Sequence, residues 1–212
     1  MIIETRAVEP FLKNGYVLGC EETREGVVID PGDEVGLLLS AVETHGLTIR
    51  YILLTHAHLD HVTGVAGAKK ALGAPVGLHR SDNFLYEQVV QQGLMFGLQV
   101  KPQPAVDFFY EGEGPLKFGR HEAWVYHTPG HCPGGVCLAV GREGDANRTL
   151  FVGDTLFAGS IGRTDLPGGD HTTLLASIRT VLFKFPDPTV VHSGHGPATT
   201  IGREKRTNPF LI

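Results

Sequence analysis

Short apolar runs alternate along the chain with segments that repeat apolar residues at helical spacing. The runs predict β-strands, because a few consecutive apolar residues between turn residues are typical of a buried strand. Segments with apolar residues three and four positions apart predict amphipathic helices. The predicted strands span residues 2–8, 15–20, 26–30, 51–54, 75–79, 115–118, 122–127, 135–140, 149–152 and 189–192. The predicted helices span residues 35–46, 62–72, 81–92 and 171–182, with Ser81 and Asp170 as N-caps.

Strands in both halves of the chain, with helices between them, predict a layered α/β fold. The length of 212 residues suits one domain, and 42% hydrophobic with 19% charged residues is an ordinary globular composition. No repeat, low-complexity tract or linker divides the sequence. We therefore predict a single domain over residues 1–212, with residues 201–212 as a basic tail.

Charge and cysteine content exclude several classes of protein. The net charge of -5 argues against a nucleic-acid binder, and no apolar run reaches the length of a membrane span. The N-terminus lacks the pattern of a secretory signal. Three cysteines without a CxxC pair make no complete disulfide framework, which predicts a cytoplasmic protein. The low charge and apolar strands are compatible with a homo-oligomer.

Residues 56–61, with the sequence His-Ala-His-Leu-Asp-His, follow the predicted strand 51–54 directly. Residues two apart in an extended segment point to the same side, so His56 and His58 face one point. Asp60 and His61 diverge from that pair and serve a second point nearby. Imidazoles with a carboxylate suit zinc, iron or manganese, and the spacing indicates two metal ions.

Further residues of metal-ligand type stand at the ends of other predicted strands. His131 follows a Pro-Gly turn, Asp154 follows the apolar strand 149–152, and His195 lies between two glycines. Asp30 ends the strand 26–30. It either caps the next helix or accepts a hydrogen bond from a ligand histidine as a second-shell residue.

The motifs HxHxDH, TPGH, GD and GHG, in this order, resemble those of the metallo-β-lactamase-fold superfamily, and most closely those of glyoxalase II and its relatives. The resemblance implies an αββα sandwich of two mixed β-sheets flanked by helices, with the active site at one edge. It also implies two divalent metal ions, with zinc first and iron or manganese as alternatives. The implied ligands are His56, His58 and His131 for one metal, Asp60, His61 and His195 for the other, and Asp154 as the bridge.

The same resemblance implies a metal-dependent hydrolase of a small-molecule thioester, such as S-D-lactoylglutathione or a related acyl-thiol. A hydroxide that bridges the two metals attacks the carbonyl, and Asp60 helps to orient it. Residues 159–165 resemble the loop that carries a basic substrate-binding residue in glyoxalase II. Arg163 in that loop is either the group that binds a substrate carboxylate or a solvated arginine.

The chief alternative is a persulfide dioxygenase, since those enzymes resemble glyoxalase II and share the Gly-Arg-Thr-Asp sequence found at residues 162–165. They use one iron, which here His56, His131 and Asp154 would hold. Classical glyoxalase II also carries a C-terminal helical domain that binds glutathione, and residues 196–212 are too few to form it. The carrier thiol therefore stays open.

Overall fold

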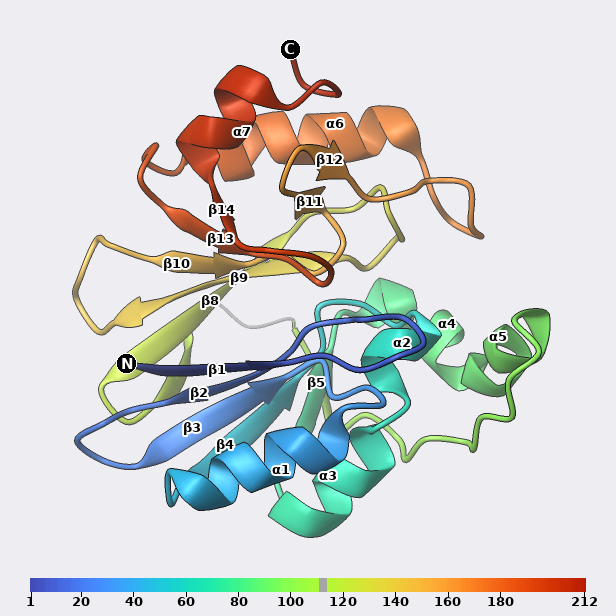
Figure 1. Ribbon diagram of the computed structural model, residues 1–212, viewed down its shortest axis with the longest axis vertical. Helices are drawn as coiled ribbons and strands as arrows, with labels where there is room; N and C mark the ends of the chain where they lie inside the picture. The colour runs from blue at the N-terminus through green and yellow to red at the C-terminus, as the bar shows by residue number, and fades with distance from the viewer. Residues whose placement is uncertain (111–113) are drawn as a thin grey trace. The chain divides into compact units, whose positions relative to one another are not determined.

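The computed structural model describes residues 1–110 and 114–212 and divides them into two compact units (Figure 1). Unit 1 comprises residues 1–110 and 117–120, and unit 2 comprises residues 114–116 and 121–212. Each unit is a mixed β-sheet with helices, as the α/β prediction requires. The prediction of one domain over residues 1–212 stays a prediction.

The sheet of unit 1 has the strand order β1-β2-β3-β4-β5-β6. The first three strands pair antiparallel and the last three continue in parallel from β3. Helices α1 and α3 pack together on one face of this sheet (Figure 1). The strands are β1 (Ile2–Arg6), β2 (Gly15–Gly19), β3 (Glu25–Ile29), β4 (Thr48–Leu53), β5 (Val76–Leu78) and β6 (Phe108–Phe109). The helices are α1 (Val35–Thr44), α2 (Leu59–Val62), α3 (Val65–Leu72), the 3₁₀ turn η1 (Arg80–Asp82), α4 (Asn83–Glu87) and α5 (Val89–Met95).

The sheet of unit 2 has the strand order β14-β13-β10-β9-β8, in which only β10 and β13 pair in parallel. Apolar side chains of α6 and of the sheet form one buried core, which includes Leu150, Leu174 and Val191. The strands are β8 (His121–His127), β9 (Val136–Arg142), β10 (Thr149–Phe151), β13 (Val190–His192) and β14 (Thr199–Thr200), with β11 (Leu156–Phe157) and β12 (Ser160–Ile161) as a separate ribbon. The helices are α6 (His171–Thr180), the 3₁₀ turn η2 (Leu182–Lys184) and α7 (Ile201–Thr207). Strand β7 (Leu116–Phe118) lies where the chain passes between the units.

The segment 81–92 is helical as predicted, but it is divided into η1, α4 and α5 in succession. The N-cap predicted for it is wrong. Ser81 is not its N-cap, because the imidazole of His79 takes that role and accepts the Ser81 backbone N–H at 3.3 Å. By contrast, Asp170 caps α6 as predicted, since its carboxylate accepts the Thr173 N–H at 2.6 Å.

The predicted tail 201–212 is also wrong, because its first seven residues form α7. The Thr200 hydroxyl caps this helix by accepting the Arg203 N–H. Glu204 is fully buried and accepts hydrogen bonds from Gly159 N–H, Thr199 Oγ1 and Asn208 Nδ2. A charged residue on the inner face hid the helical pattern of this segment.

Across the described residues, no helix has the length and apolar content that a membrane span requires.

Candidate metal centre

The predicted metal motif begins at His56, three residues after the last residue of β4 in unit 1. His56 and His58 are buried, and their ring centroids lie 4.8 Å apart. The ring of His61, on α2, lies 4.0 Å from that of His56. The Asp60 carboxylate lies 3.7 Å from Nε2 of His61. Unit 1 therefore gathers four ligand-type side chains in one place, as the spacing predicted.

Asp30 orients one of these histidines. Its Oδ2 lies 2.9 Å from Nδ1 of His61, which donates to it, and it also accepts the Thr55 hydroxyl at 2.6 Å. Its Oδ1 accepts the Thr55 N–H at 2.7 Å. Because Nδ1 of His61 carries the proton, Nε2 keeps a lone pair for a metal. Helix α1 has no side-chain cap, so of the two readings of Asp30 the helix cap is wrong.

Two residues that the sequence analysis missed hold the backbone of the motif. The buried carboxylate of Asp82 accepts the Ala57 N–H at 3.0 Å. The Gln92 amide accepts the Leu59 N–H and donates to the Ala57 carbonyl, both at 3.0 Å. Asp82 looked like an ordinary helix-start residue, and a glutamine in a helical segment carries no signal of its own. These contacts keep the chain extended between the histidines.

Unit 2 presents His131 from a turn that packs against α6. A Cβ on Gly130, which has φ +131°, would lie 2.2 Å from the Leu174 backbone nitrogen, so only glycine fits there. Ser177 donates to the Pro129 carbonyl at 2.7 Å and fixes the turn from the helix. Nδ1 of His131 donates to the Arg163 carbonyl at 2.7 Å, which leaves Nε2 for a metal.

Asp154 lies between two histidines of the same unit. Its Oδ2 is 3.7 Å from Nε2 of His131 and 3.5 Å from Nε2 of His195. The adjoining loop is closely packed, because a Cβ on Gly162 would lie 1.9 Å from the Asp154 carbonyl oxygen. The structure thus brings together the three ligand-type side chains that the sequence predicted for this half of the chain.

Arg163 lies on the surface and is paired within its own loop. Its guanidinium donates twice to the Asp165 carboxylate, each time at 2.7 Å, and both side chains are more than half exposed. The hydrogen bond from Arg163 lowers the pKa of Asp165 to about 2. The guanidinium is therefore accessible to a ligand, but a substrate carboxylate would compete with Asp165 for it.

The donor chemistry of both units fits divalent metal ions. Unit 1 offers three imidazoles and a carboxylate, and unit 2 offers two imidazoles and a carboxylate. Such mixed nitrogen and oxygen donors suit zinc, iron and manganese. In His61 and His131, a hydrogen bond on Nδ1 sets the tautomer that metal binding needs.

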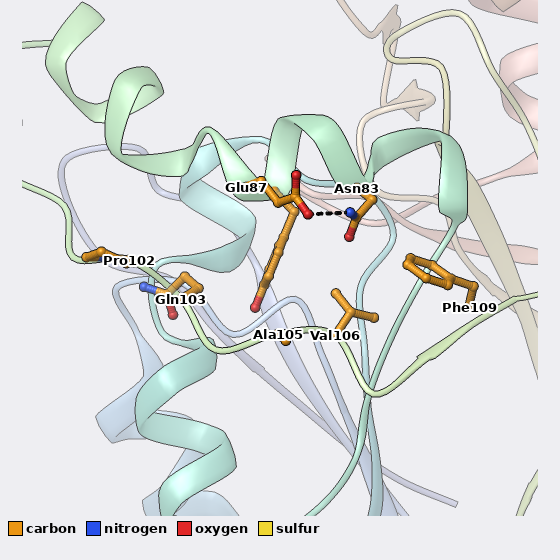
Figure 2. Close-up of a pocket in the computed structure, with 8 residues that line it drawn as sticks. Asn83, Glu87, Pro102, Gln103, Ala105, Val106 and Phe109 are labelled. Atoms are coloured by element: carbon orange, nitrogen blue, oxygen red, sulfur yellow. Dashed lines mark hydrogen bonds between the residues drawn. The ribbon is translucent and has the colours of Figure 1, made fainter.

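Unit 1 also contains a cavity of about 430 Å³, whose lining includes none of these donors (Figure 2). On its wall, Nδ2 of Asn83 donates a hydrogen bond of 2.8 Å to Oε1 of Glu87. Figure 2 marks this bond with a dashed line. The cavity is lined by Asn83, Tyr86, Glu87, Pro102, Gln103, Ala105, Val106 and Phe109. None of these is a predicted ligand, so the cavity is not part of the candidate centre.

A family model and a curated relative both match this chain over most of its length. The family model described as the metallo-beta-lactamase superfamily matches residues 8–195. The chain is 39% identical over 213 residues to the hydroxyacylglutathione hydrolase GloC of Haemophilus influenzae, which covers 100% of this chain and 98% of that protein.

Solved structures repeat the likeness over the full length. A B3 metallo-beta-lactamase, BLEG-1, is 39% identical with a TM-score of 0.90, and the match covers 100% of both chains. TTHA1623, solved in a di-iron-bound form, is 44% identical with a TM-score of 0.85 and covers 98% of this chain and 100% of its own. ETHE1 from Myxococcus xanthus is 28% identical with a TM-score of 0.76 and covers 99% of this chain and 84% of its own.

Proposed function

The chain belongs to the metallo-β-lactamase superfamily, and on that premise we propose that it is a hydrolase of small thioesters such as S-D-lactoylglutathione. The family and the full-length relative support a metallo-hydrolase. The finer assignment rests on one observation, the 39% identity to a hydroxyacylglutathione hydrolase along the whole chain. The proposed partner is therefore a small molecule.

We further propose that seven of the predicted residues bind two divalent metal ions. His56, His58 and His131 would hold the first ion, Asp60, His61 and His195 would hold the second, and Asp154 would contribute its carboxylate to both. The position of the Asp154 carboxylate between two imidazoles supports its bridging role. Zinc is the proposed metal, with iron and manganese as alternatives, and the di-iron form of TTHA1623 supports keeping iron among them.

The reaction needs few other groups from the protein. Bound divalent ions would lower the pKa of a coordinated water towards about 7 and polarise the thioester carbonyl. Asp60 would orient the attacking water. The hydrogen bond that His61 donates to Asp30 fixes the orientation of the His61 ring. The leaving thiol has a pKa of about 8.5, so it departs without a general acid.

No cysteine nucleophile takes part in this scheme. Burial raises the pKa of the Cys137 thiol to about 11, so that side chain stays protonated at neutral pH. Cys20 and Cys132 are also buried. Burial raises the pKa of Cys20, but hydrogen bonds, first that of the Thr23 side chain, outweigh it and lower this pKa to about 7. None of the three cysteines is among the proposed metal ligands, so the scheme takes water as the attacking group.

A persulfide dioxygenase is the second candidate. The Gly-Arg-Thr-Asp sequence at residues 162–165 and the likeness to ETHE1 favour it. In that enzyme His56, His131 and Asp154 would hold a single iron, and His61 and His195 would be left without a metal.

Metal content separates the two candidates. Protein purified without added metal is expected to contain about two metal ions per chain by elemental analysis and to hydrolyse S-D-lactoylglutathione. One iron per chain, no thioester hydrolysis and oxygen uptake with a persulfide would contradict the hydrolase and support the dioxygenase.

Arg163 is proposed to bind a carboxylate of the substrate. Arg163→Gln is expected to raise KM by about tenfold with kcat nearly unchanged, because an ionic hydrogen bond made equally in ground and transition state is lost. The matched variant Asp165→Asn, which frees the guanidinium, is expected to lower KM in the same steady-state assay. An unchanged KM in both variants would leave Arg163 as a solvated loop residue.

A further inference from the structure

A buried ion pair lies behind the metal motif of unit 1. Lys13 and Glu34 are each 2% exposed, and Nζ of Lys13 donates to Oε1 of Glu34 at 2.5 Å. The same ammonium donates to the backbone carbonyl of Asp30. Lysine and glutamate are almost never buried to this extent unless they are paired. Neither residue takes part in the proposed chemistry.

The pair closes around the turn formed by residues 30–32. Oε1 of Glu34 also accepts the Gly32 N–H at 2.9 Å, so lysine and glutamate together hold both ends of the turn. Asp30 has φ +49°, in the left-handed region that costs a non-glycine residue free energy. A backbone of this kind persists only where its surroundings hold it. Thr55 and His61 hold the Asp30 side chain, and Lys13 of the ion pair holds its carbonyl.

The turn at residues 30–32 packs closely against the backbone of the metal motif. A Cβ on Gly32 would lie 2.0 Å from the carbonyl oxygen of Asp60. A Cβ on Gly64 would lie 2.2 Å from the carbonyl oxygen of Gly32, and the Gly64 N–H donates to Pro31 at 3.0 Å. Any shift of the turn would therefore move the backbone that carries Asp60, and the Asp30 carboxylate would lose its place beside His61.

We propose that Lys13 and Glu34 are positioning residues for the metal ligands Asp60 and His61. This inference rests on the proposed metal site. A buried ion pair adds little stability compared with apolar side chains of similar volume, so stability alone does not account for it. Its hydrogen bonds to Asp30 and Gly32 set the geometry of the turn, and the turn sets the position of the two ligands.

The test compares metal affinity with stability in three variants. Lys13→Met is expected to weaken the binding of one of the two metal ions by about tenfold, in competition with a chromophoric chelator, as loss of an outer-shell partner does. The control is Lys69→Met, which breaks the more exposed pair with Asp107 in the same unit and is expected to leave metal affinity unchanged. The double variant K13M/E34M is expected to regain thermal stability but not metal affinity, because the hydrogen bonds to the turn stay absent.

Wild-type metal affinity in Lys13→Met would overturn the proposal, and so would recovery of both stability and affinity in the double variant. If Lys13→Met does not fold, Glu34→Gln keeps the side-chain volume and one acceptor oxygen and is compared in the same way. A wild-type protein that binds no metal would instead refute the proposed function, and this inference with it.

Discussion

Replacing Asp60 or His131 by alanine is expected to remove most of the thioester hydrolysis. The two residues come from different units, and the proposal gives each of them to a different metal ion. Asp60 also orients the attacking water, and loss of such a group costs about 10²–10⁴-fold in rate. The measurement is kcat together with metal content on each purified variant.

The matched control is His127→Ala, which removes an exposed histidine of unit 2 whose ring contacts the Pro133 carbonyl. It is expected to keep wild-type turnover and metal content. The ligand assignment would be wrong for Asp60 or His131 if the corresponding variant retained full metal content and wild-type kcat.

Replacing Asp30 by alanine is expected to lower both stability and activity. The change leaves the Thr55 N–H, the Thr55 hydroxyl and Nδ1 of His61 without their carboxylate acceptor in a buried site. Each unmade buried hydrogen bond costs about 1–3 kcal/mol, so we expect the three together to lower the free energy of unfolding by about 3–9 kcal/mol. Urea denaturation of the metal-free protein measures it.

Asp30→Asn separates the two effects. Asparagine tolerates the left-handed backbone at φ +49° and keeps one acceptor oxygen, so most of the stability is expected to remain. Metal affinity is nevertheless expected to fall by about 10–100-fold, because the ring of His61 loses its charged acceptor. Equal metal affinity in Asp30→Asn and wild type would show that the carboxylate charge does not tune the ligand.

Much of the candidate centre was predictable because its information is local. The motif at residues 56–61 follows a buried strand directly, so strand periodicity and side-chain type together locate four donors. His131, Asp154 and His195 each stand at a strand end or a glycine-bounded turn, where ligand-type residues are expected. The alternation of strands and helices likewise gave the α/β class.

The parts that were not predictable depend on contacts between distant residues. Glu204 is buried because Gly159, Thr199 and Asn208 supply hydrogen bonds to it, and no local pattern announces that environment. Asp82 and Gln92 support the motif only because tertiary packing brings their side chains to its backbone. Lys13 looks like a surface lysine in the sequence and is a core residue in the structure.

The backbone and the side chain of Arg163 make separate contacts. Its carbonyl holds His131 whatever side chain the residue carries, while its guanidinium points to an exposed carboxylate and is open to exchange. Selection can therefore vary this side chain to suit a new substrate without disturbing the histidine beneath it. The loop is a natural starting point for directed evolution of specificity, and a library restricted to the side chains at 163 and 165 would leave the hydrogen bond to His131 intact.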